Sequence, residues 1–133
     1  MQDNIFDLTQ LILTKKIDQA RDLVKDLTLQ GEDEIKLIAI MLGQFRLYTQ
    51  VKILQESGQT ESQMVSSLGH YLGRNPNPYQ IKFALRDTRG LSLNFLQDSI
   101  RYLIQADYQI KTGVYEKGYL FEKALLQIAS QSN

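Results

Sequence analysis

The chain has 133 residues, of which 43% are hydrophobic and 23% are charged, a composition typical of one globular domain that buries a core without disulfides or metals. Fifteen basic residues balance fifteen acidic residues, so the net charge does not favour a nucleic-acid or acidic-membrane partner. The chain contains no cysteine, which excludes disulfides, thiol nucleophiles and cysteine-ligated metal centres.

Helical periodicity predicts an all-α fold. Apolar residues recur about every 3.6 residues along most of the chain, and patterns typical of strands are poor. Both prolines lie within residues 75–78 and no low-complexity linker divides the chain. We therefore expect one domain over residues 1–133, a single bundle of six to seven helices around a long central helix. The expected helices cover residues 4–13, 17–29, 32–57, 60–68, 78–90, 92–111 and 119–130.

Capping residues mark several of these helix starts. Asp3 or Asn4 is positioned to cap the first helix, because its side chain can accept hydrogen bonds from the free N–H groups of the first turn. Thr60 and Gln63 form the Thr-x-x-Gln pattern of a capping box. Pro78 needs no N–H partner at the first position of a helix, which favours a helix start there.

The segment 32–57 is expected to be the central helix. Its first half is apolar nearly all round, which predicts burial on more than one side. The acidic residues at 32–34 complement the positive end of a helix dipole, so we do not interpret them as a cation site. The apolar residues of the first half are Ile35, Leu37, Ile38, Ala39, Ile40, Met41 and Leu42.

The helix expected at 92–111 has a wide apolar arc. At about 100° per residue, a core stripe lies within roughly 80° of its first apolar residue, and further side chains widen the arc to roughly 200°. An arc this wide predicts packing against two surfaces, and another subunit is a candidate for the second. The stripe contains Leu93, Leu96, Ile100, Leu103 and Ile104, and the arc is widened by Phe95, Ser99, Tyr102, Ala106 and Ile110.

Asp107 and Lys111 fall inside this apolar arc. They are four residues apart with the acid first, which favours an ion pair along the helix. Lys111 also lies in the last turn, where the helix dipole favours a cation, and Gly113 is a suitable helix cap. We expect a buried structural ion pair whose disruption costs about 3–5 kcal/mol. A catalytic acid at Asp107 is the less favoured alternative.

Few residues suggest chemistry. The sequence has no Gly-x-x-x-x-Gly-Lys-Ser/Thr phosphate loop, and its single histidine, His70, has no neighbouring metal-ligand spacing. We therefore expect no catalytic, cofactor-binding or metal-binding residues. No apolar run approaches the roughly 20 residues of a membrane span, and residues 1–4 lack a secretory pattern. We expect a soluble, cytoplasmic protein with no membrane partner.

A pair of helices near the middle of the chain resembles a DNA-binding element. The helix beginning at Pro78 follows a shorter helix and carries the basic residues Lys82, Arg86 and Arg89. A helix-turn-helix protein places such a second helix in the major groove. The expected connection of about nine residues is longer than the usual 3–4-residue turn, which argues against this motif. DNA contact by these three residues is therefore a secondary prediction.

Five segments, in their order and spacing, are similar to one protein family. They are Gln44-Phe45-Arg46-Leu47, residues 59–69, residues 77–82, Leu91-Ser92-Leu93 and residues 107–113. Together they resemble the C-terminal domain of the delta subunit of bacterial DNA polymerase III, a part of the sliding-clamp loader. The resemblance covers essentially the whole chain. Its most specific element is the Asp-x-x-Ile-Lys-x-Gly string that ends the sixth expected helix.

The resemblance implies a helical collar domain for oligomerisation. In that family the full subunit has two further, N-terminal domains with an ATPase-like fold, which the resemblance implies are absent from these 133 residues. The collar is expected to pack beside the collar domains of delta prime and gamma/tau type subunits in a five-membered ring. It would meet the sliding clamp and DNA only through the complete complex. The domain itself would be non-catalytic, with DNA-directed DNA polymerase (nucleotidyltransferase) activity belonging to the holoenzyme.

The collar role suggests which residues meet a neighbour. We expect Phe95 and Tyr102, on the wide apolar arc, to contribute to packing between subunits. Two other functions remain open from the sequence. One is a stand-alone nucleic-acid-binding domain that uses the basic helix at 78–89, and the other is a helical adaptor from an unrelated family. An enzyme is the least favoured interpretation.

Overall fold

Seven α-helices and no strand make up the part of the chain that the structure describes. The structure is a computed structural model that describes residues 2–133, apart from the side chains of Gln2, Asp3 and Tyr71. The all-α prediction is confirmed. The helices are α1 (Gln2–Leu13), α2 (Ile17–Leu29), α3 (Glu34–Glu56), α4 (Glu61–Leu72), α5 (Pro78–Asp87), α6 (Leu93–Lys111) and α7 (Lys117–Ala129).

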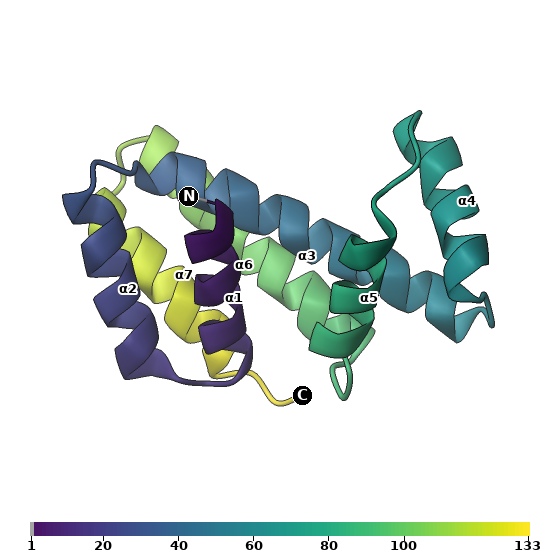
Figure 1. Ribbon diagram of the computed structural model, residues 1–133. Helices are drawn as coiled ribbons and strands as arrows, with labels where there is room; N and C mark the ends of the chain where they lie inside the picture. The colour runs from purple at the N-terminus through teal and green to yellow at the C-terminus, as the bar shows by residue number, and fades with distance from the viewer. Residues whose placement is uncertain (1) are drawn as a thin grey trace.

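Helix α3 runs across the whole molecule, and the other helices are arranged around it (Figure 1). Helices α1 and α2 lie at one end and α4 and α5 at the other, while α6 packs along its length and α7 lies beside α6 at the end that holds α1 and α2. Helix α4 projects beyond the bundle and packs mainly on its neighbour α5 and the far end of α3. The predicted central helix is therefore confirmed.

Most helix boundaries agree with the sequence patterns. The Thr60 side chain accepts from the backbone N–H of Gln63 and the Gln63 side chain accepts from that of Thr60, as a capping box requires. Asn77 and Ser92 cap α5 and α6 as expected. Helix α1 begins at Gln2, so Asn4 lies inside the helix and does not cap it. The side chain of Asp3 lies outside the described residues.

Helix α4 is longer and α5 shorter than expected. No residue between 69 and 72 forces the chain out of a helix, so α4 continues to Leu72. It ends at Gly73, which adopts the left-handed conformation at φ 73°. Helix α5 stops at Asp87, three residues before Gly90. The connection between the two helices therefore covers residues 73–77 and not the nine residues expected.

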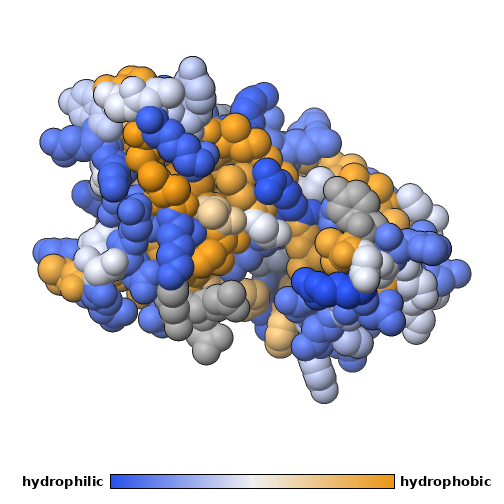
Figure 2. All heavy atoms as spheres, turned by 90° about the horizontal axis from the view of Figure 1, so that it is seen from above, coloured by the Kyte–Doolittle hydropathy of each residue, from blue (hydrophilic) through white to orange (hydrophobic). Residues whose placement is uncertain are grey.

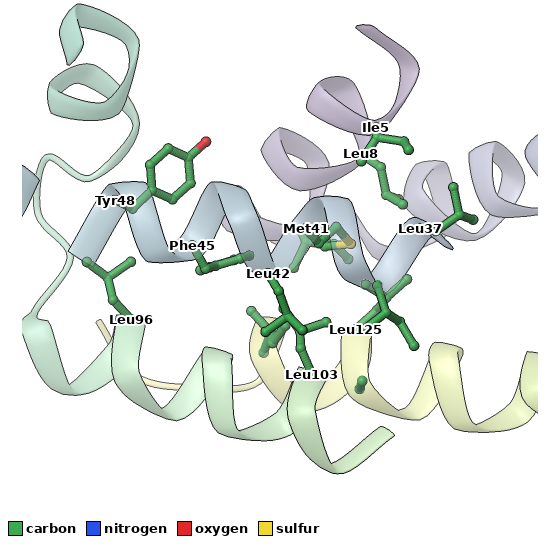
Figure 3. Close-up of a cluster of buried hydrophobic side chains, with 14 of the residues drawn as sticks. Ile5, Leu8, Leu37, Met41, Leu42, Phe45, Tyr48, Leu96, Leu103 and Leu125 are labelled. Atoms are coloured by element: carbon green, nitrogen blue, oxygen red, sulfur yellow. The ribbon is translucent and has the colours of Figure 1, made fainter. Parts of the chain in front are cut away.

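The core is built around several faces of α3 (Figure 3). Phe45 and Met41 are fully buried, and Leu103 of α6 and Leu125 of α7 approach from one side while Leu8 of α1 approaches from another. Burial on more than one side, predicted from the sequence, is confirmed. By length and composition α3 would also satisfy the criteria for a membrane span, contrary to the sequence prediction. Its apolar character is accounted for by its central place in the bundle.

A polar network locks three helices together. Asp87 ends α5 with its carboxylate only 6% exposed. Its Oδ1 accepts from Gln10 Nε2 of α1 at 2.9 Å and from Arg86 Nε at 3.1 Å, and its Oδ2 accepts from the Tyr48 hydroxyl of α3 at 3.0 Å. Burial, followed by the charge and hydrogen bond of Asp87, raises the pKa of Tyr48 far above its usual range. The phenol is therefore held as a permanent donor.

A second cross-link joins the turn after α1 to the end of α7. Lys15 has a positive φ of 63°, which is uncommon outside glycine. Its ammonium donates to the carbonyl oxygens of Ala129 at 2.8 Å and Gln131 at 2.7 Å. A cation at the negative end of α7 is favoured by the helix dipole. The Gln131 side chain in turn donates to Ser99 Oγ of α6 at 2.8 Å.

The expected burial of the Asp107–Lys111 ion pair is wrong. Lys111 Nζ lies 2.9 Å from Asp107 Oδ2, but the side chains of Lys111 and Asp107 are 58% and 25% exposed. The wide arc of α6 is covered on the flank that holds Ser99 and Ala106, whereas the flank that holds Ile104 is open to solvent. An exposed pair one helical turn apart contributes about 0.3–0.5 kcal/mol, not the several kcal/mol of a buried pair.

Replacing Asp87 and Asp107 in turn tests which of the two carboxylates stabilises the fold. Asp87→Ala should lower the free energy of unfolding by about 2–3 kcal/mol, because it leaves buried donors on Tyr48 and Gln10 without an acceptor. Asp107→Ala should lower it by about 0.5 kcal/mol or less. Urea denaturation followed by circular dichroism measures both. Equal losses in the two variants would contradict the assignment of Asp87 as the junction of α1, α3 and α5.

The contribution of this network to stability should also depend on pH in the alkaline range. The unfolded Tyr48 phenol ionises near pH 10, whereas the folded phenol stays protonated to higher pH. Its contribution to stability is therefore complete below about pH 10 and declines as the pH rises above that value. The difference in unfolding free energy between wild type and Tyr48→Phe, measured between pH 8 and pH 11, should shrink with rising pH. A constant difference would show that the phenol ionises equally in both states.

Candidate interface on helices α6 and α7

The structure separates the two residues predicted to meet another subunit. Phe95 is 3% exposed, because the flank of α6 that it shares with Ser99 faces the end of α7, where Gln131 binds Ser99. Its side chain therefore packs inside this chain and is not available to a partner, so the prediction does not hold for Phe95. Tyr102 is half-buried at the edge of the same flank. It stays the candidate for packing against another subunit.

Tyr102 lies in a groove between α6 and α7. The groove has a volume of about 530 Å³ and is lined by apolar and polar side chains. Tyr119 is 53% exposed and Leu126 is also exposed, although both belong to a helix whose opposite face is fully buried. The groove is lined by Tyr102, Tyr119, Glu122, Lys123, Leu126, Gln127, Ser130 and Gln131. Two of these residues are tyrosines, a residue type enriched at protein interfaces.

Aromatic and basic side chains extend this surface at both edges. The rings of Tyr115 and Tyr119 are 4.7 Å apart between centroids and tilted by 48°. On the α6 side, the Arg101 guanidinium lies 5.7 Å from the centroid of the Tyr102 ring, and its Nη2 is 3.0 Å from Asp98 Oδ1. Tyrosine and arginine are the residue types that most often dominate binding energy at interfaces.

A second groove lies on the other side of α7. It separates α7 from α2, has a volume of about 600 Å³, and shares Glu122 and Leu126 with the first groove. The side chain of Glu122 accepts from Arg21 Nε of α2 at 2.7 Å. Helix α7 is therefore a ridge between two grooves. Helices pack by placing rows of side chains on one helix between those of the other, and the exposed side chains of α7 can pack with a partner helix in this way.

Sequence reasoning identifies only part of this surface. In α7 the residues Phe121, Leu125 and Ile128 share a buried face, whereas Tyr119 and Leu126 lie outside it. An apolar residue on the outer face of an otherwise amphipathic helix is therefore the signal that could have located the groove. The open flank of α6, with Ile104 and Tyr108 exposed, differs from the covered arc that helical spacing predicts.

The residues considered for chemistry are scattered. No group of three His, Asp or Glu side chains suited to a metal ion occurs among the residues that the structure describes. His70 is exposed in the last turn of α4. Asp87 has its carboxylate occupied by three donors. These positions offer no arrangement of a nucleophile, a base and a stabilising donor around a common point.

The three basic residues considered for DNA contact are all exposed. Lys82 and Arg86 lie on the outer face of α5, and Arg89 follows in the turn after it. Arg86 is partly engaged within the chain, since its guanidinium lies 4.9 Å from the centroid of the Phe83 ring and its Nε binds Asp87. The five-residue connection before α5 is closer to a helix-turn-helix than expected but still longer than the usual turn. DNA contact by these residues stays a prediction.

Comparison with known proteins places this chain in a family. Residues 2–128 match the family described as DNA polymerase III delta subunit, C-terminal domain. The DNA polymerase III subunit delta of Bacillus subtilis (strain 168) is 33% identical over 132 residues, which is 99% of this chain and 36% of that protein. The chain thus spans little more than a third of the length of this relative.

A solved structure shares the arrangement of helices. The Bacillus subtilis DNA clamp loader delta protein (YqeN) superposes with a TM-score of 0.83 at 32% sequence identity. The superposition covers 98% of this chain and 37% of that chain. The sequence match and the fold agree over nearly every residue. The chain therefore belongs to the family formed by the C-terminal domains of DNA polymerase III delta subunits.

Proposed function

We propose that this chain is the non-catalytic assembly domain of a clamp-loader delta subunit, and that it packs against the corresponding domain of another loader subunit through α6 and α7. The observation that carries the proposal is the ridge of α7, with exposed Tyr119 and Leu126 between two grooves. Burial of such side chains is what a helix-to-helix contact between subunits requires. The family membership supplies the kind of partner.

The partners in this proposal are the delta prime and gamma/tau type subunits, whose collar domains would complete a ring with this one. Residues 1–133 then act as one collar domain. Contact with the sliding clamp and with primed DNA occurs through the complete complex, and polymerisation belongs to the holoenzyme. The cytoplasm is the compartment in which such a complex meets bacterial DNA.

Tyr102 is expected to be an energetic centre of the contact. It is half-buried already, so it loses little side-chain freedom on binding, and its ring borders the groove beside α7. Central tyrosines that become fully buried at interfaces commonly contribute about 2 kcal/mol or more to binding, roughly a thirtyfold change in affinity. A carboxylate at the same position would lose its water on binding, and the cost of desolvating that charge would oppose association.

Mixing the chain with delta prime and gamma/tau type subunits of the same species tests the proposal. We expect light scattering to show a complex that contains this chain, and Tyr102→Glu to weaken its formation by at least about thirtyfold. Tyr79→Glu is the matched control, because Tyr79 is an exposed tyrosine on α5. It should assemble like wild type, and circular dichroism should show that both variants fold.

Two results would contradict the proposal in different ways. Failure of the wild-type chain to associate, while a full-length delta subunit does, would remove the assembly role. Normal assembly by Tyr102→Glu would retain the role but move the contact away from the groove between α6 and α7.

A further inference from the structure

A further groove lies on a different face of the bundle and shares no lining residue with either groove beside α7. It is formed by α1, α3 and α5 and has a volume of about 520 Å³. Figure 2, which views the molecule from above, shows hydrophobic side chains gathered over the middle of the bundle. The groove is lined mainly by Phe6, Ala39, Ile40, Gly43, Leu47 and Phe83.

Gly43 leaves space in this groove that the chain itself does not use. It lies in the middle of α3, where glycine costs about 1 kcal/mol relative to alanine. A Cβ atom at this position would meet no atom within 4 Å, so no neighbour in the chain requires the glycine. Ala39 lies one turn earlier on the same face. The floor of the groove therefore permits the close approach of another backbone.

Aromatic side chains form the end of the groove between α1 and α5. The rings of Phe6 and Phe83 meet edge to face with their centroids 6.0 Å apart. Phe83 nevertheless remains 42% exposed. An exposed ring beside an apolar floor loses further water contact when a partner docks, and burying that apolar surface favours the docked state. The groove is thus both open and favourable to cover.

The charge on the α5 rim is positive. Arg86 lies over the Phe83 ring at this edge, and Lys82 is exposed one turn earlier on the outer face of the helix. The carboxylate of Asp87 is turned into the bundle, where it accepts from Gln10 and Tyr48. The Arg86 guanidinium stacks on Phe83 and uses its Nε for Asp87, and the side chain is still 54% exposed. A partner that lies in the groove therefore meets cations along this edge, and acidic side chains complement them.

The length of the apolar floor matches about two turns of a helical partner. From Ala39 to Leu47 the helix rises by about 12 Å, roughly two turns. A helical partner places apolar side chains at i, i+3 or i+4, and i+7 over the same length. We propose that this groove binds an amphipathic α-helix of another protein, with an apolar stripe on the α3 floor and acidic residues facing Lys82 and Arg86.

The experiment uses a displayed library of helical peptides. All members carry a fixed apolar stripe and random residues on both flanks, so the charge of the flanks is itself a result. Selection against the wild-type chain should enrich peptides with Asp and Glu on one flank. The best synthetic peptide, labelled with a fluorophore, should bind Gly43→Leu at least tenfold more weakly in anisotropy titrations, because leucine fills the groove.

Matched variants distinguish a loss of peptide binding in the groove from a loss of folding and from a loss of the proposed contact between subunits. Gly43→Leu should melt no lower than wild type, since leucine favours a helix and the added side chain begins in open space. Lys82→Glu should weaken the acidic peptide several-fold, and a peptide whose acids are replaced by lysine should bind poorly to wild type. Tyr102→Glu should bind the peptide normally, so failure of the α6–α7 proposal would leave this result unchanged.

Several outcomes would overturn the inference. The acidic helix would be ruled out as the occupant if selection against the wild-type chain enriched no more peptides than selection against Gly43→Leu. Enrichment of peptides with basic flanks would also rule it out. A concentration-dependent dimer of the free chain that Gly43→Leu abolishes would assign the groove to a second copy. Displacement of the peptide by a DNA oligonucleotide, with DNA binding lost in Lys82→Glu, would assign the rim to nucleic acid.

Discussion

Burial of α3 on several sides at once is the constraint on which the rest of the structure depends. A helix that is apolar nearly all round is stable in water only when other helices cover most of its surface. Helices α1, α5, α6 and α7 supply that cover, and each of them packs on a different part of the surface of α3. Met41 and Phe45 hold the centre of this arrangement with no exposed surface. The groove lined by Ile40 and Gly43 is the place where this cover is incomplete.

Apolar burial alone does not fix how the covering helices are placed, because it has no direction. Asp87 supplies direction. Its carboxylate binds Gln10 of α1 and Tyr48 of α3, and buried donors and acceptors lose free energy when any partner shifts out of reach. The network thus holds α1 and α5 at a set spacing over α3. At that spacing the rings of Phe6 and Phe83 meet edge to face at the end of the groove, so a polar contact inside the core contributes to the shape of a surface outside it.

Local sequence signals predicted the helices well, and they predicted three-dimensional proximity poorly. The capping box at Thr60 and the cap at Ser92 depend on residues three positions apart, which a single sequence displays directly. The Asp87 network joins residues separated by 39 and 77 positions, and no local pattern marks such a contact. The same limit explains α6. Helical spacing showed that Phe95, Asp107 and Lys111 share an apolar arc, but which flank is covered depends on where α7 returns, and Lys15 and Gln131 set that position.

Two faces of the domain carry residues that folding does not require, and these are the faces proposed to bind partners. Gly43 weakens the central helix by about 1 kcal/mol relative to alanine and relieves no crowding. On a separate face of the bundle, Tyr119 and Leu126 expose apolar surface that polar residues would replace at no cost to the core. Stability alone would not retain either choice, since both are at positions where substitution meets open solvent. A domain that is stabilised by one strongly buried helix can tolerate such losses on two separate faces. This is the arrangement that the two proposals together require, with a ring neighbour packed on α7 and a different partner on the face of α3.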